Sequence, residues 1–188
     1  IYDLRNYKVR TLKPIETKFE GRRIYLMPPP SSGGVLIKLA LNLATRTHLA
    51  KYDPLSVNEL HYMGEILSRS FRGRALLGDP DFHKNPIEML TSNSHAESMA
   101  KKISKNKSIK LPPMIEKTTT KESKETTHFS IMDSRGNAIS MTITLNGGYG
   151  SGVVSEKYGI ALNNEMDDFT TRPGEPNMFG LIQGKGNV

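Results

Sequence analysis

Two adjacent threonines, Thr126 and Thr127, open a β-rich run directly after a lysine-rich tract, in a chain without cysteine. A threonine hydroxyl in mid-chain is a poor nucleophile. If the bond between Glu125 and Thr126 is cut, however, Thr126 gains an α-amino group with a pKa of about 8, which is partly neutral at physiological pH. That amine can take the hydroxyl proton, directly or through water, so one residue supplies both nucleophile and base.

A second threonine is expected close to this candidate nucleophile. Two β-rich runs joined by Ser-Arg-Gly-Asn predict a hairpin over residues 126–146. If Asp133 lies opposite Ala138, then Thr127 faces Thr144, and the candidate nucleophile is one residue away. Cross-strand neighbours lie roughly 5–8 Å apart. This register predicts that Thr144 hydrogen-bonds to the hydroxyl of the candidate nucleophile and orients it.

The same residues also allow a purely structural interpretation. Paired threonines are typical of strand starts because β-branched side chains suit a pleated surface. The segment LNNEMDDF, which follows the hairpin, is consistent with a solvated acidic turn. It could instead present Glu165 and Asp168 to a cationic amine, with Asn146 and Asn164 as neutral hydrogen-bond partners. The pattern alone leaves these alternatives open.

A folded frame must position these side chains, and the upstream sequence predicts one. Residues 1–30 are expected to be extended. A helix then follows, with an apolar stripe at Val35, Leu39 and Leu43. A second helix begins at Ser56, which forms a capping box with Glu59. Its expected core stripe comprises Leu60, Met63, Leu67 and Phe71. A third, shorter helix is expected from His95.

Charge and composition limit the possible functions. The net charge is +7, but Lys101 to Glu125 alone contains eight lysines and three glutamates, so +5 of it lies in one polar tract. We interpret residues 105–125 as an exposed linker, not as a nucleic-acid site. No run approaches the roughly 20 apolar residues of a membrane span. The histidines lack metal-ligand spacing, so no metal site is expected.

The motifs together resemble one enzyme family. TTHFSIMDSRGNAISMTITLNGGYGSG and GIALNNEMDDFTTRPGEPNMFGL resemble the start of the small subunit of γ-glutamyltranspeptidases, which are N-terminal nucleophile hydrolases. MPPPSSGG and LGDPDF are similar to the end of the family's large subunit. The resemblance implies an α+β fold, a four-layer αββα sandwich present here as a partial chain. It assigns 1–104 to the large subunit, 105–125 to a linker ending at the cleavage site, and 126–188 to the small subunit.

The resemblance also implies residue roles. Thr126 matches the residue that attacks the carbonyl of Glu125 during autocleavage and then serves as the catalytic nucleophile. Thr144 matches the second threonine that hydrogen-bonds to it. The residues that hold the α-amino end of the γ-glutamyl group match Asn146, Glu165 and Asp168. Phe179 lies in a segment similar to the lid of bacterial members, where a tyrosine is common, so we expect a looser gate.

The implied reaction is γ-glutamyl acyl transfer or hydrolysis, with glutathione or another γ-glutamyl compound as donor and an amino acid, peptide or water as acceptor. No cofactor is implied, and family members act in the periplasm or are secreted. Further substrate-binding and oxyanion groups are expected in the remainder of the two subunits, so the chain alone is expected to be inactive. The alternatives are a sister β-lactam acylase, a poly-γ-glutamate depolymerase, or an inactive binding remnant.

Overall fold

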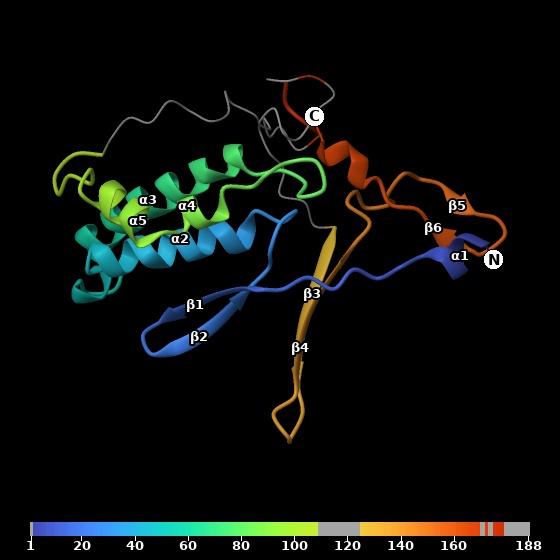
Figure 1. Ribbon diagram of the computed structural model, residues 1–188, viewed down its shortest axis with the longest axis horizontal. Coiled ribbons are helices and arrows are strands. Elements are labelled where there is room, and N and C mark those ends of the chain that lie inside the picture. The colour runs from blue at the N-terminus through green and yellow to red at the C-terminus, as the bar shows by residue number, and fades with distance from the viewer. Residues whose placement is uncertain (1, 109–124, 170–171, 173–174, 179–188) are drawn as a thin grey trace. The chain divides into compact units, whose positions relative to one another are not determined.

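The computed structural model describes residues 2–108, 125–169, 172 and 175–178. The chain divides into two compact units, Ile1–Met114 and Ile115–Gly186 (Figure 1), which we call the helical unit and the hairpin unit. Most of the predicted linker 105–125 lies outside the described residues. The proposed division at 104 and 125 therefore stays a prediction.

The helical unit contains every α-helix of the described residues. Its elements are α1 (Tyr2–Asn6), β1 (Ile15–Phe19), β2 (Arg22–Leu26), α2 (Gly33–Arg46), α3 (Val57–Arg72), α4 (Ile87–Leu90) and α5 (Asn93–Ala100), with short 3-10 turns at Leu49–Lys51 and Gly73–Leu76. Strands β1 and β2 form an antiparallel hairpin. The expected extended segment 1–30 is thus a short helix followed by this hairpin.

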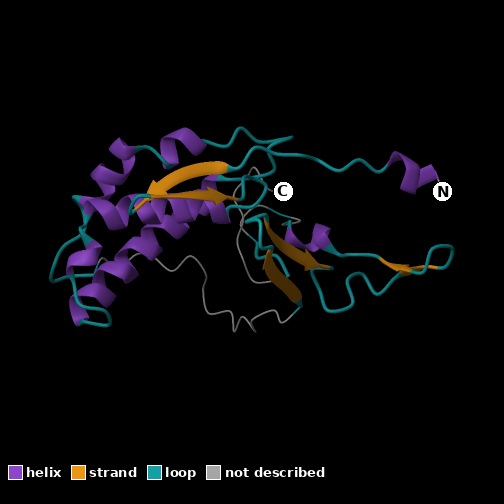
Figure 2. Ribbon diagram, turned by 90° about the horizontal axis from the view of Figure 1, so that it is seen from below, coloured by secondary structure: helices purple, strands orange, loops and turns teal. Residues whose placement is uncertain are grey.

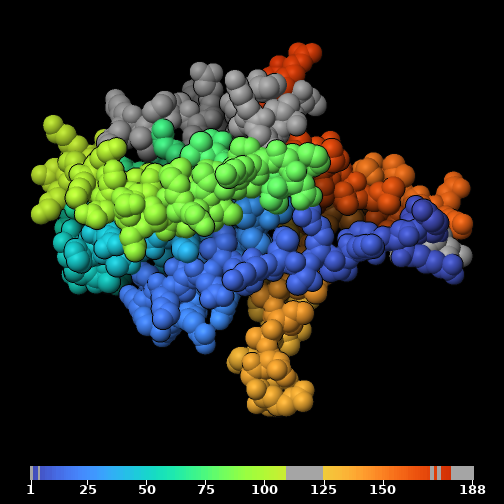
Figure 3. Space-filling model, viewed as in Figure 1, coloured from blue at the N-terminus to red at the C-terminus, as the bar shows by residue number. Residues whose placement is uncertain are grey.

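Helix α2 is the centre of the helical unit. Val35, Leu39 and Leu43 are completely buried, as the apolar stripe predicts. Leu39 and Leu43 form a core with Ile66 of α3 and Ala96 of α5. The β1–β2 hairpin packs against α2 (Figure 3). A side chain at position 34 would collide with the carbonyl oxygen of Met27, so glycine allows α2 to begin directly against the end of β2.

Helix α3 begins at the predicted cap residue, but only half of the predicted capping box forms, because the Ser56 amide donates to the Asp53 carbonyl at 3.0 Å and not to Glu59. The Ser56 hydroxyl accepts a hydrogen bond from the Glu59 amide at 3.2 Å, which caps the helix. The predicted apolar stripe is not the buried face, although Met63 is partly buried. Leu60, Leu67 and Phe71 are 41–54% exposed. The buried face instead comprises Tyr62, Glu65, Ile66, Arg69 and Ser70.

The reason is a buried ion pair that the pattern of apolar residues does not reveal. The Arg69 guanidinium donates to the Glu65 carboxylate one turn away. A second guanidinium nitrogen donates to the Lys102 carbonyl at 3.2 Å. Because the two charges neutralise each other and are hydrogen-bonded, α3 can turn this polar pair inward. The helix is therefore rotated away from the orientation that apolar periodicity predicts.

The hairpin unit has short strands and little helix. Its elements are β3 (Thr126–Met132), β4 (Ala138–Thr144), β5 (Val154–Ser155), β6 (Ile160–Ala161) and a 3-10 turn, η3 (Glu165–Asp168). In the described residues each sheet is a separate pair of strands (Figure 2). Helices and antiparallel pairs give the expected α+β class, while the four-layer sandwich stays a prediction.

Candidate active site

The β3–β4 hairpin places the two candidate threonines directly opposite each other. Thr126 pairs with Thr144, and Met132 pairs with Ala138. The predicted register, which set Thr127 opposite Thr144, is therefore wrong by one residue. The error matters because successive side chains of a strand point to opposite faces, so the observed pairing sets both hydroxyls on one face.

The turn explains the shift. The Asp133 amide donates to the Asn137 carbonyl at 2.9 Å, so Asn137 belongs to the ladder and the loop has three residues instead of four. The Gly136 amide closes the turn on the Asp133 carbonyl at 3.1 Å, and Gly136 has φ +84°. A turn followed by a left-handed glycine is a common three-residue hairpin connection.

The hairpin has one polar and one apolar face. On the polar face, a hydrogen bond of 3.0 Å joins Ser130 and Ser140. His128 lies two residues from the candidate nucleophile on this face, and its ring nitrogens contact Thr142 at 2.8 Å and Ser140 at 3.0 Å. Both ring nitrogens of His128 are thus engaged within the sheet. The apolar face carries Phe129, Ile131, Ile139, Met141 and Ile143.

Thr144 receives two hydrogen bonds at the open end of the hairpin. The Thr126 hydroxyl donates to Thr144 Oγ1 at 3.2 Å, and the Asn146 amide donates to the same oxygen at 2.9 Å. The first bond fixes the direction of the Thr126 O–H bond, so the lone pairs of the Thr126 oxygen remain available to other groups.

Asn146 follows the hairpin in a strained but well-supported position. Its backbone has φ +73°, a conformation that asparagine tolerates better than most residues, and its side chain is 7% exposed. Its side-chain amide donates to the Asn164 carbonyl at 3.0 Å. The structure therefore connects Thr126, Thr144 and Asn146 to the residue that directly precedes the acidic turn.

The acidic turn η3 contains both predicted carboxylates, Glu165 and Asp168. Partial burial raises the pKa of Glu165, and the negative charge of Asp168 raises it further. The Glu165 amide donates to the Asn163 side chain at 3.0 Å, which holds the start of the turn. Two carboxylates in one turn can bind a cationic ligand.

Of the predicted cleavage and lid residues, the structure describes Glu125 and Thr126. A Cβ atom placed on Gly148 would stand 2.5 Å from a carboxylate oxygen of Glu125. The Glu125 side chain therefore packs against the backbone of Gly148. Phe179 lies outside the described residues. The preceding residues contact η3: the Asn177 side chain donates to the Asp168 carbonyl at 2.8 Å, and the Met178 amide approaches the Asp167 carbonyl at 3.5 Å.

The sequence suggested Asn164 only as a neutral hydrogen-bond partner for a bound amine, and it did not predict that this residue joins two segments of the hairpin unit. Its side chain accepts from the Gly147 amide at 2.7 Å and donates to Asp167 at 2.9 Å. An asparagine beside a second asparagine in an acidic loop carries no distinctive signal. Only the folding of the loop back onto Gly147 makes it a bridge.

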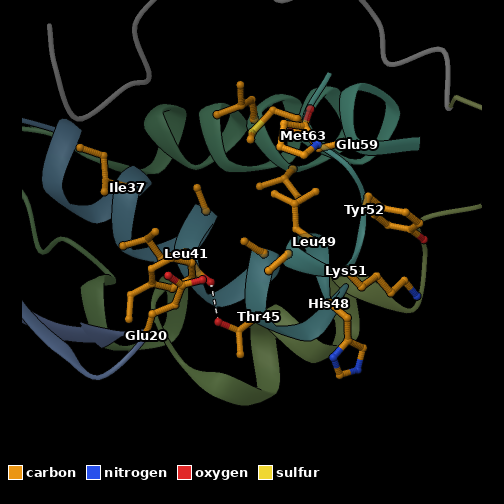
Figure 4. Close-up of a pocket in the computed structure, with 17 residues that line it drawn as sticks. Glu20, Ile37, Leu41, Thr45, His48, Leu49, Lys51, Tyr52, Glu59 and Met63 are labelled. Carbon is orange, nitrogen blue, oxygen red and sulfur yellow. Dashed lines mark hydrogen bonds between the residues drawn. The ribbon is translucent and has the colours of Figure 1, made fainter. Parts of the chain in front are cut away.

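A separate apolar hollow of about 1160 Å³ lies in the helical unit. Ile37 and Leu41 of α2 and Met63 of α3 point into it, and His48 lies at its edge (Figure 4). Leu67, which was expected in the core, also lines it. None of the predicted site residues contributes to this hollow, so its lining gives it no part in the candidate active site.

Across residues 2–108 and 125–169, no cluster of three or more His, Asp or Glu side chains could hold a metal ion. Within these same residues, no helix has the length and apolar character needed to cross a membrane.

Comparisons with known proteins point to one family. The pattern that defines the gamma-glutamyltranspeptidase family matches residues 1–188. Glutathione hydrolase proenzymes of Escherichia coli (strain K12) and Pseudomonas sp. (strain A14) are 41% and 40% identical over 190 residues, which is 99% of this chain and 32% of each relative. The crystal structure of Helicobacter pylori gamma-glutamyltranspeptidase matches 56% of this chain and 31% of that chain, with a TM-score of 0.52 and 27% identity.

These matches define the class of protein. The chain belongs to the γ-glutamyltranspeptidase family. It spans about a third of the length of the curated relatives that it matches.

Proposed function

We propose that the protein carrying this chain transfers or hydrolyses γ-glutamyl groups, with Thr126 as nucleophile. The observation that carries the proposal is the 3.2 Å hydrogen bond from the Thr126 hydroxyl to Thr144, at the head of a hairpin in a member of this family. The named relatives are glutathione hydrolases, which supports glutathione as a donor.

The first step of the proposal is self-cleavage. The Thr126 oxygen attacks the Glu125 carbonyl carbon, the C–N bond between the two residues breaks, and the nitrogen takes up the hydroxyl proton. The resulting ester is hydrolysed by water, which leaves a carboxylate on Glu125 and a free α-amine on Thr126. The Glu125 side chain beside Gly148 supports this step, because it fixes the residue whose carbonyl is attacked.

Turnover then proceeds in two halves. The Thr126 oxygen attacks the γ-carbonyl carbon of the donor while the free α-amine accepts the hydroxyl proton. The C–N bond of the donor then breaks, and its amine takes up that proton as it leaves. Water or an acceptor amine then attacks the acyl-enzyme and regenerates the threonine. A covalent intermediate of this kind predicts ping-pong kinetics.

The acidic turn is proposed to bind the substrate ammonium. Glu165 and Asp168 lie in one turn, where partial burial and the charge of Asp168 raise the pKa of Glu165, and a bound ammonium would favour the ionised form of Glu165. Asn146 is proposed to accept or donate a hydrogen bond at the same end of the substrate. Phe179 is proposed as part of a lid that excludes water from the acyl-enzyme.

Two further proposals concern the fold and the localisation of the whole protein. We propose that β3 and β4 join the central sheets of a four-layer αββα sandwich, because Ile131, Ile139 and Ile143 are 48–59% exposed on one face of the hairpin. The remaining segments of both subunits would cover that face. Periplasmic or secreted localisation is proposed from family membership.

The test is Thr126→Ala in the full-length protein. We expect intact mass to remain that of one uncleaved chain, and turnover of γ-glutamyl-p-nitroanilide to fall by at least about 10³-fold. The unaltered protein should give two pieces, the smaller beginning Thr-Thr-His-Phe. Thr127→Ala is the matched control and should still be cleaved. Cleavage and turnover by the Thr126→Ala protein at the unaltered rate would refute the proposal.

A further inference from the structure

We infer that Asn164 is a positioning residue that fixes the substrate-binding acidic turn relative to the nucleophile hairpin. This inference rests on the proposed function and adds to it a residue that touches no reacting atom. Its basis is that the Asn164 side chain bridges three separate segments: the glycine turn after β4, the acidic turn η3, and the residues that precede Phe179.

Every polar group of the Asn164 side chain is used. The side-chain oxygen accepts from the Gly147 amide at 2.7 Å. The side-chain nitrogen donates to the Asp167 carboxylate at 2.9 Å and approaches the Met178 sulfur at 3.4 Å. An asparagine amide offers an acceptor oxygen and two N–H donors, so these contacts match its capacity.

The Asn164 backbone connects the same segments. Its amide donates to the Leu145 carbonyl at 3.1 Å, and its carbonyl accepts from the Asn146 side chain at 3.0 Å and from the Asp167 amide at 3.0 Å. Asn146 in turn donates to Thr144, the partner of Thr126. A movement of Asn164 would therefore be transmitted to both the hairpin and the acidic turn.

The glycine turn is built to let this contact form. A Cβ atom on Gly147 would stand 3.2 Å from the Asn164 side-chain oxygen, which is closer than ordinary van der Waals contact. A Cβ atom on Gly150, which has φ +56°, would collide with the Leu162 carbonyl. The backbone of 147–150 thus packs directly on 162–164, and Asn164 provides the specific hydrogen bonds at that contact.

Two substitutions distinguish the Asn164 hydrogen bond to Gly147 from the Asn164 hydrogen bond to Asp167. Asn164→Asp keeps an acceptor for the Gly147 amide but loses the donor to Asp167 and sets two carboxylates against each other. Asn164→Ala loses both ends. A role in positioning the ammonium site predicts that the aspartate variant is impaired in substrate binding more than in chemistry, because the hairpin contact survives.

The experiment measures KM and kcat for γ-glutamyl-p-nitroanilide in the full-length protein. For Asn164→Asp we expect KM to rise at least tenfold at pH 8, with kcat within about threefold of the unaltered value. The KM defect should shrink as pH falls through the pKa of the new carboxyl, since its protonated form can again donate to Asp167. For Asn164→Ala we expect a rise in KM and a fall in kcat, neither of them relieved at low pH.

Ser151→Ala is the matched control. The Ser151 hydroxyl donates to the Leu162 carbonyl at 3.2 Å, so it joins the same two segments without touching Asn164. We expect its KM and kcat to stay within about twofold of the unaltered values. A general loss of folding stability would lower activity in all variants without a pH-dependent KM.

The outcomes are distinguishable. If the unaltered protein does not turn over the substrate, the proposed function fails, and this inference fails with it. If the unaltered protein is active and Asn164→Asp matches its KM at every pH, the inference alone is overturned. It is also overturned if both Asn164 variants fail to self-cleave while Ser151→Ala matures normally, because Asn164 would then act in maturation instead.

Discussion

The helical unit and the hairpin unit are each stabilised by a different kind of interaction. In the described residues, the buried hydrophobic side chains all lie between Val35 and Ala96, in the helical unit. The only buried residue in the described part of the hairpin unit is the polar Asn146. Hydrophobic burial therefore stabilises the first unit, while hydrogen bonds between short segments shape the second.

This difference suits the proposed roles of the two units. A two-stranded hairpin alone is marginally stable in water, and the apolar face of β3–β4 is exposed in this chain. The candidate nucleophile thus lies on an element that needs other parts of the protein to cover it. The helical unit, in contrast, already contains its own core of Leu39, Leu43, Ile66 and Ala96.

The largest expected effect is on the helical core. Leu39→Ala removes a completely buried side chain, so we expect the free energy of unfolding of the helical unit to fall by about 2–5 kcal/mol. Urea unfolding followed by circular dichroism at 222 nm measures this, because all described α-helices lie in that unit. A change below about 1 kcal/mol would contradict the assigned core.

Ile139→Ala is the counterpart in the hairpin. Ile139 is 48% exposed, so in the 188-residue chain we expect a loss of less than about 1 kcal/mol. If the hairpin enters a sandwich in the full-length protein, the same substitution should cost about 2–5 kcal/mol there. An equally small effect in both proteins would argue against the proposed sandwich.

Glycine-to-alanine substitutions should change stability in opposite directions in the two units. Gly64 lies in α3 with open space around it, so Gly64→Ala should stabilise the helical unit by about 0.5–1 kcal/mol. Gly136 has φ +84° and equally open space, so Gly136→Ala should destabilise the β3–β4 turn by about 1–2 kcal/mol. Amide hydrogen exchange of each unit measures both effects. The same sign in both would refute the assigned backbone conformations.

The smallest expected effect is electrostatic. Asp168→Asn removes the second cause of the raised pKa of Glu165, so this pKa should fall but stay above its ordinary value because burial remains. Carbon-13 NMR titration of the side-chain carboxyl measures it, and Asp168→Glu is the charge-retaining control. An unchanged pKa in the asparagine variant would exclude the charge of Asp168 as a cause.

The sign of the pH dependence follows from the direction of that shift. Since the folded-state pKa of Glu165 is raised, the folded state favours the protonated carboxyl. Its contribution to stability is fully present below the unfolded-state pKa and is lost as pH rises through the folded-state pKa. A bound ammonium should reverse this loss at neutral pH.

Sequence reasoning succeeded where a local rule decides the structure. The stripe of Val35, Leu39 and Leu43 and the Ser56 cap were predicted correctly, because helix periodicity and capping depend on neighbouring residues. It was wrong about the buried face of α3, because the Glu65–Arg69 pair makes polar residues suitable for burial. It was also wrong by one residue in the hairpin register, because the loop length depends on whether Asn137 joins the ladder.

The sequence by itself determined helices α2, α3 and α5, the two strands of the β3–β4 hairpin and the motifs that identify the family. Only the tertiary structure decided that Thr126 lies opposite Thr144, and that Asn164 joins Gly147 to the acidic turn. The physical reason is the range of the interactions. Helix periodicity and caps act over a few residues, whereas the register and the Asn164 bridge depend on contacts between segments up to 18 residues apart.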